Sequence, residues 1–284
     1  MEGETALTPP PPVDPRHFTA LYERAFAERI EKFGEKDART AEVARNLGLF
    51  LAKQGDRANA ETWLRRALSI SEQMHQPRSR ELCEAREALA RVVTGESERR
   101  ELHRLASRSD DAATAARNLA QLAALEGNDV SLLRQALAQQ ERATGPQSAP
   151  VALRLNDLGL ALQEPEPAVS TGLFRRALAI NQRTLGAQHP ETATTMNNLA
   201  NVLAATGEAS AAEVLQRRAY AVFVARLGPQ HVRSGITASN LAGTLMTLGR
   251  QAEGKKWFTT AHTIFEQALG PDHAWTREAA ENSR

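Results

Sequence analysis

Apolar residues recur along this chain at the spacing of a helix that buries one face. Met196, Leu199, Ala200 and Leu203 fall at positions i, i+3, i+4 and i+7, which lie on one side of an α-helix. A turn residue, Gly207, follows, and a second helical pattern then runs through Leu215-Gln216-Arg217-Arg218-Ala219. The segment is therefore predicted to form two antiparallel helices joined by a short turn.

The same two-helix pattern repeats along the chain. A short string with a polar residue, Leu and a small residue recurs around Leu47, Leu119, Leu158, Leu199 and Leu241, with a degenerate copy at Leu89. The residues before these leucines are at positions 46, 88, 118, 157, 198 and 240, so the steps are 42, 30, 39, 41 and 42. The spacing is regular near both ends and irregular in the middle, which predicts shortened helices there.

Three further landmarks support the repeat. A glycine breaks the first helix at positions 55, 127, 207 and 249, and small residues that allow close helix packing occur at Ala67, Ala177, Ala219 and Ala261. Each later unit closes with Leu-Gly, followed by His189, His231 or His273 at steps of 42 residues. Since zinc ligands must lie about 2.0 to 2.1 Å from one ion, and successive repeats are further apart than that, these histidines are predicted to mark helix entries.

These strings, turns and alanines resemble the tetratricopeptide repeat family. The 42-residue spacing with Leu185-Gly186 and His189-Pro190 is similar to the longer-helix variant found in kinesin light chains. The resemblance implies an all-α fold, a right-handed α-solenoid of about six helix-turn-helix repeats with capping helices. We expect a disordered Pro-rich tail at 1–14 and a single solenoid domain at 15–284, with degenerate repeats around 76–145, regular repeats at 146–270 and a C-terminal cap at 273–284.

The resemblance also places a peptide-binding groove on the first helix of each repeat. An Asn amide can both donate to and accept from an extended peptide backbone, and Arg can pair a carboxylate in forked geometry. The alternative is that these amides hydrogen-bond within the array and the arginines lie on a solvated face. The candidate groove residues are Arg45, Asn46, Arg117, Asn118, Gln121, Asn156, Asp157, Asn197, Asn198, Asn201 and Asn240.

Composition limits the kinds of partner and site that this chain is expected to have. The 35 basic and 34 acidic residues nearly balance, which disfavours nucleic acid and anionic membranes as partners. Cys83 is the single cysteine, and no hydrophobic leader or membrane-length apolar run occurs, so a cytoplasmic location is expected. No catalytic residues, metal site or cofactor are predicted.

We expect an adaptor or scaffold that binds a peptide segment or partner protein, with self-association open. A regulatory subunit whose ligand-dependent curvature controls an enzyme is the alternative, and an RNA-binding array is less favoured.

Overall fold

The computed structural model describes residues 15–284, and every regular element in that range is an α-helix. The expected tail at 1–14 lies outside the described residues. Contacts divide the chain into two compact units, the first ending at Leu122 and the second running from Ala123 to Arg284. The division falls within helix α6 (Ala112–Leu125).

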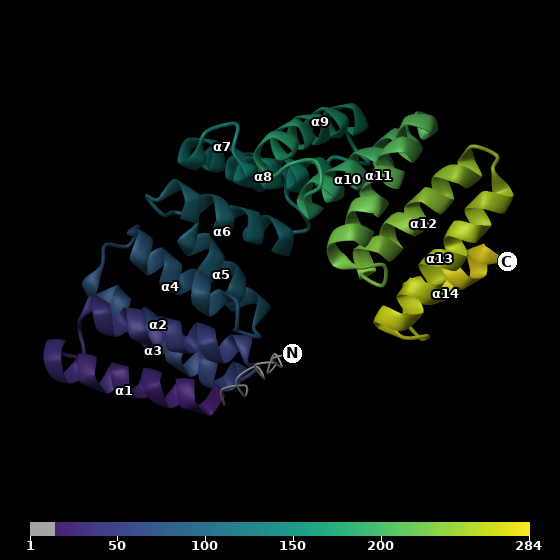
Figure 1. Cartoon of the computed structure of the whole chain (residues 1–284). Helices are drawn as coiled ribbons and strands as arrows, with labels where there is room; N and C mark the ends of the chain where they lie inside the picture. The colour runs from purple at the N-terminus through teal and green to yellow at the C-terminus, as the bar shows by residue number, and fades with distance from the viewer. Residues whose placement is uncertain (1–14) are drawn as a thin grey trace, which may run out of the picture. The chain divides into compact units, whose positions relative to one another are not determined.

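Unit 1 begins with a single helix that packs on a helical hairpin. Helix α1 (Pro15–Phe33) precedes α2 (Ala38–Lys53) and α3 (Arg57–Met74), followed by α4 (Arg80–Ala90), α5 (Glu96–Ala106) and the first part of α6 (Figure 1). Phe26 of α1 meets Trp63 of α3 edge to face, with ring centroids 4.9 Å apart. This contact is consistent with the capping role expected of the first helix.

Unit 2 contains the regular hairpins. Its helices are α7 (Val130–Thr144), α8 (Ala149–Ala161), α9 (Pro167–Thr184), α10 (Pro190–Ala205), α11 (Ala209–Leu227), α12 (Val232–Thr247), α13 (Gln251–Leu269) and α14 (Ala274–Ser283) (Figure 1). Phe174 packs with Leu199 and Leu203 in one buried cluster, and Phe265 lies in another with Ala238 and Ala279. The predicted all-α fold of helical hairpins is confirmed.

The irregular spacing has a direct structural cause. Helices α4 and α5 contain 11 residues each, whereas α11 and α13 contain 19. The 30-residue step between positions 88 and 118 is therefore a shortened hairpin, as the spacing predicted. The regular 42-residue spacing is seen in the starts of three helices, because α10, α12 and α14 begin at Pro190, Val232 and Ala274.

The predicted turns and helix entries are confirmed. Gly207 has φ 91° and Gly228 has φ 99°, a left-handed conformation that L side chains rarely adopt. The three histidines are the N-caps of α10, α12 and α14, and each Nδ1 accepts a hydrogen bond from the backbone N–H two residues later, at 3.1 to 3.2 Å. They start helices and do not converge on one point.

A second hydrogen bond at the start of each of these helices was not predicted from the sequence. The hydroxyl of Thr192 donates to the carbonyl of Gly186 at 2.8 Å, and Thr276 does the same to Gly270 at 2.8 Å. Ser234 makes the equivalent bond to Gly228 at 3.1 Å. These buried hydroxyls bind each inter-repeat loop to the helix that follows it.

Candidate functional site

A pocket of about 400 Å³ lies between α2, α4 and α6 in unit 1. Three elements far apart in sequence contribute to it, and its lining is rich in guanidinium groups. We call it the arginine pocket, and its lining residues are Arg45, Asn46, Leu49, Glu84, Glu87, Ala88, Arg91 and Arg117.

Glu84 of α4 is held by two arginines. Arg45 of α2 donates from Nη1 to Oε2 at 2.7 Å, and Arg80 donates from Nε to Oε1 at 2.8 Å. Burial raises the pKa of the Glu84 carboxyl, but the hydrogen bonds from Arg80 and Arg45 outweigh it, so the pKa lies below its ordinary value. Glu84 therefore stays ionised and fixes Arg45 at the pocket.

Glu87, one turn further along α4, is also held by two arginines. Arg91 donates from Nη2 at 2.6 Å and Arg117 of α6 donates at 3.2 Å. Glu87 is 6% exposed, whereas the side chains of Arg91 and Arg117 are 59% and 42% exposed. The carboxylate is buried beneath guanidinium groups that still reach solvent, so these groups remain accessible to a ligand.

A buried hydrogen-bond chain lies behind Glu87. Asn118 of α6 is fully buried; its Nδ2 donates to the Thr114 carbonyl at 2.9 Å and lies 3.4 Å from Glu87 Oε2. His103 of α5 meets Asn118 Oδ1 through Nδ1 at 2.8 Å, so Nδ1 is the donor. Burial lowers the pKa of His103, with the Asn118 bond and Glu87 opposing it. The chain joins α4, α5 and α6 beneath the pocket.

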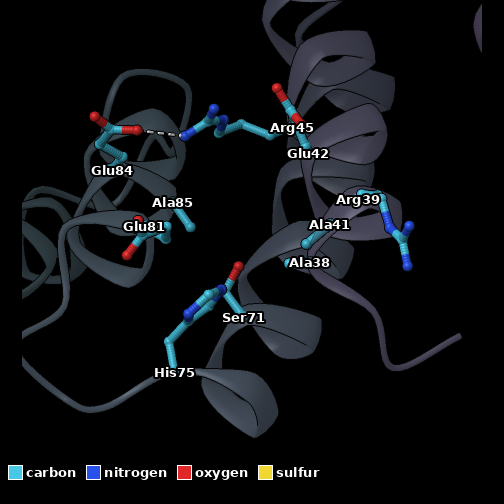
Figure 2. Close-up of a pocket in the computed structure, with 10 residues that line it drawn as sticks. All are labelled: Ala38, Arg39, Ala41, Glu42, Arg45, Ser71, His75, Glu81, Glu84 and Ala85. Carbon is cyan, nitrogen blue, oxygen red and sulfur yellow. Dashed lines mark hydrogen bonds and ion pairs between the residues drawn. The ribbon is translucent and has the colours of Figure 1, made fainter.

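A second pocket, of about 250 Å³, adjoins the arginine pocket and shares Arg45 and Glu84 with it. Figure 2 shows the Arg45–Glu84 ion pair bridging the two sides of this pocket, with Glu42 and Glu81 also on its lining. The remaining arginine of the lining, Arg39, pairs with an aspartate outside it. The surface therefore changes from acidic here to basic in the arginine pocket.

In unit 2 the recurring amides bond mainly to one another. Asn156 of α8 donates to Thr195 Oγ1 of α10 at 3.0 Å, and Asn198 donates to Asn156 Oδ1 at 3.4 Å. Asn240 of α12 donates to Asn197 Oδ1 at 3.2 Å. Successive first helices are thus joined by side-chain amides, and we call this set the amide ladder.

The predicted groove residues therefore divide into two groups. Asn118, Asn156 and Asn197 are buried, and contrary to the expectation that they line a groove, a peptide has no access to them, because their amides satisfy one another or buried neighbours. Partly or fully exposed are Arg45, Asn46, Arg117, Gln121, Asp157, Asn198, Asn201 and Asn240. The structure brings Arg45, Asn46 and Arg117 together in one pocket.

Asp157 and Asn201 have partners of their own. Asp157 Oδ2 lies 3.0 Å from Arg154 Nη1, and burial raises the pKa of Asp157 while Arg154 opposes the rise. Asn201 Oδ1 accepts from Gln216 at 3.3 Å. Both residues remain candidates, yet neither lies on the wall of the arginine pocket or of the pocket beside it.

Sequence reasoning missed a pocket of about 220 Å³ in unit 2 between α12, α13 and α14. We call it the tryptophan pocket; its lining is Ile236, Ser239, Asn240, Phe265, Trp275 and Glu278. A signal was present, because Trp275 stands 42 residues after Arg233 and 84 after Glu191, at one repeat position. An aromatic side chain where the preceding repeats carry charge marks a local change of surface.

Neither a metal centre nor a membrane span is found in residues 15–284. No group of three or more His, Cys, Asp or Glu side chains in that range is arranged to hold a metal ion. No helix there combines the length and apolarity needed to cross a membrane.

Comparison with known sequences identifies the repeat. One profile described as Tetratricopeptide repeat matches residues 167–223, and a second with the same description matches residues 40–81 and 236–274. A comparison with curated proteins returned no match.

Solved structures share the helical-repeat fold. Pseudomonas aeruginosa PilF is 23% identical, covering 87% of this chain and 99% of that chain, with a TM-score of 0.55. The Cut9–Hcn1 hetero-tetramer of the APC/C is 13% identical, covering 96% of this chain and 49% of that chain, with a TM-score of 0.63.

Proposed function

We propose that this chain, which contains tetratricopeptide repeats at residues 40–81, 167–223 and 236–274, is an adaptor that binds an acidic segment of a partner protein at the arginine pocket. Repeats of this kind generally mediate protein–protein interactions. The observation that supports this proposal is the excess of guanidinium groups there. Three arginines of its lining, Arg45, Arg91 and Arg117, accompany only two carboxylates, Glu84 and Glu87.

The pairing leaves room for a ligand. Each guanidinium carries five N–H donors, and its bonds to Glu84 or Glu87 use only some of them. A carboxylate of a partner can take the outward donors of Arg91 and Arg117 without displacing Glu87. Asn46, which is exposed at the edge of the pocket, offers an amide to the partner's backbone.

The carboxylates of the partly buried Glu84 and the buried Glu87 also prepare the site. Arginine loses rotamer freedom when a ligand immobilises it, at about 0.5–1.5 kcal/mol for each side chain. Glu84 and Glu87 already restrict these arginine side chains through hydrogen bonds in the free protein, so less conformational entropy is lost when a ligand binds. Preorganised guanidinium groups favour an ionised carboxylate over a neutral amide.

A peptide-display experiment tests the proposal without a known partner. A library of random peptides, including free C-termini, is selected on the whole chain and on an Arg91→Gln/Arg117→Gln variant. Peptides enriched in Asp, Glu or a terminal carboxylate are expected on the wild type and not on the variant. A selected peptide should bind the variant about tenfold or more weakly, since hydrogen bonds to charged groups contribute about 1.5–3 kcal/mol.

Arg65→Gln is the matched control. Arg65 lies in the same unit, is half exposed and also pairs with two carboxylates, Glu61 and Glu98, but it does not line the pocket. This control should select the same acidic peptides as the wild type, and circular dichroism should show equal helicity in all three proteins. Selection of the same peptides by the double variant would refute the proposal.

A further inference from the structure

We propose that the tryptophan pocket of unit 2 binds a lysine or arginine side chain of a partner protein. This inference is independent of the arginine pocket, because the two sites share no residue. It rests on the combination of an aromatic wall, an unpaired carboxylate and free oxygen acceptors around a space of about 220 Å³.

The aromatic wall is held in place from two sides. Trp275 is 43% exposed, and its ring lies 5.7 Å from that of Phe265, which is buried. The ring of His273 lies 5.2 Å from the indole, and the same histidine caps the helix that carries Trp275. A fixed, partly exposed indole is the most favourable aromatic partner for a cation.

The acceptors around this wall suit a cation. Asn240 uses its Nδ2 to donate to Asn197 Oδ1 at 3.2 Å, which leaves Oδ1 as its acceptor group. Ser239 supplies a hydroxyl on the preceding residue of α12. An ammonium or guanidinium group brings only donors, so it can satisfy these oxygens where a carboxylate could not.

Charge supports the same occupant. Glu278 lines the pocket and forms no ion pair among residues 15–284. The arginine of α12, Arg233, is already paired with Glu191 of α10 at 2.9 Å. The pocket therefore carries one uncompensated negative charge, and Ile236 and Phe265 provide an apolar surface for the aliphatic stem of a basic side chain.

Titration followed by NMR of the indole N–H groups tests the inference directly. The chain has three tryptophans, and a Trp275→Phe variant assigns the signal of Trp275. The probes are N-acetyl-lysine amide, N-acetyl-arginine amide and, as the uncharged match of lysine, N-acetyl-norleucine amide. We expect the two basic probes to shift the Trp275 signal in a saturable way and the norleucine probe to have little effect.

Two variants distinguish the effect of the Glu278 charge from a general effect on the fold. Glu278→Gln keeps the shape of the pocket, and it should weaken the basic probes about tenfold because it removes a charge-assisted bond. Glu281→Gln changes a carboxylate on the same helix outside the pocket, and it should leave binding unchanged. Equal shifts with norleucine, no shift with either basic probe, or equal loss in both variants would overturn the inference.

Discussion

The arginine pocket of unit 1 and the tryptophan pocket of unit 2 both use exposed faces of first helices, yet their surfaces carry opposite charge. In unit 1 the partly buried Glu84 and the buried Glu87 hold guanidinium groups that remain accessible to solvent. In unit 2 the amide ladder joins the helices with neutral bonds, and the carboxylate of Glu278 has no ion-pair partner among residues 15–284. A repeat can thus preserve its packing while its exposed positions take different chemistry.

The helices themselves also differ between the two regions. The arginine pocket is built across α4, an 11-residue helix, and its neighbour α5 supplies His103 to the buried chain. The tryptophan pocket is built on helices of 16 and 19 residues and on the last helix, α14. In unit 1 polar residues of α2, α4 and α6 meet across one shortened helix, whereas in unit 2 two long helices and the 10-residue α14 form the pocket.

The largest expected effect comes from removing a core side chain in one region at a time. Leu64 of α3 and Phe174 of α9 are both fully buried. Leu64→Ala should cost about 2–5 kcal/mol and Phe174→Ala about 3–5 kcal/mol, measured by urea unfolding. Hydrogen exchange should rise around α2 and α3 in the first variant and around α9 and α10 in the second.

The exposed residue Leu160 supplies the control for those truncations. Leu160 is 51% exposed, so Leu160→Ala should change stability by less than about 1 kcal/mol. If Leu64→Ala raised exchange equally throughout both units, the two units would not open independently.

A smaller effect is expected where two helices approach over a glycine. A Cβ on Gly48 would lie 2.5 Å from Leu64 Cγ and 3.1 Å from the Ala60 carbonyl. Gly48→Ala should therefore cost about 1–3 kcal/mol through overpacking, seen as a lower unfolding midpoint. Gly172 is helical, and no neighbouring side chain or helix lies within 4 Å of the place its Cβ would take, so Gly172→Ala should instead stabilise by about 0.5–1 kcal/mol. Equal destabilisation by both changes would contradict this packing.

The helix entries offer a comparison of capping groups. Asp56 caps α3 in unit 1 by accepting from the Asn59 N–H, and His231 caps α12 in unit 2. Alanine at either position should cost about 0.5–2 kcal/mol, measured by thermal or urea unfolding. His231→Asp should restore most of the loss, because a carboxylate also accepts the backbone N–H. A neutral His231→Ala change would show that this cap contributes no stability.

The smallest expected effect is the pH dependence that His103 of unit 1 contributes. Because burial lowers the pKa of His103 below 6.5, the unfolded state binds a proton more readily than the folded state. The stability that neutral His103 contributes is fully present above its ordinary pKa, which is that of the unfolded state. This stability is lost as the pH falls from the ordinary pKa to the lower pKa of the folded state. Glu87 opposes the shift, and Arg91 and Arg99 favour it.

The pH effect is measured by urea unfolding at about pH 8 and about pH 5, on either side of the ordinary imidazole pKa. His103→Gln removes the titrating group while keeping a side chain able to donate to Asn118. The wild type should lose more stability than this variant on acidification, and an identical loss would exclude His103 as the source. Acid-sensitive changes elsewhere in the chain are common to both proteins and cancel in the comparison.

Much of the local structure could be predicted from the residues alone. The periodicity of Met196, Leu199 and Leu203 specifies a helix through interactions between neighbouring turns, and the glycine at 207 specifies where that helix ends. The 30-residue step also predicted the short hairpin. The helix and turn signals act over a few residues, and the step is the distance between two such signals, so none of them depends on contacts between distant residues.

The candidate site was predicted less completely. Asn46 and Asn118 occupy the same position of their repeats, yet Asn46 is exposed while Asn118 is buried against His103 and Glu87. Nothing in the repeated string distinguishes them, because burial depends on which residues the neighbouring helices place above each one. Arg45 and Arg117 were identified as candidates, but their carboxylate partners lie 39 and 30 residues away.

Hydrophobic periodicity and backbone preferences are local, so the residues alone specify a series of helical hairpins, the positions of the turns and the hairpin that is short. The contacts between helices specify the rest: the internal amide ladder, the carboxylates that hold the arginines of unit 1, and the pocket that Trp275 and Glu278 share with Asn240. Burial, charge pairing and pocket shape could not be predicted in the same way, because each depends on side chains that are distant in the chain and meet only after folding.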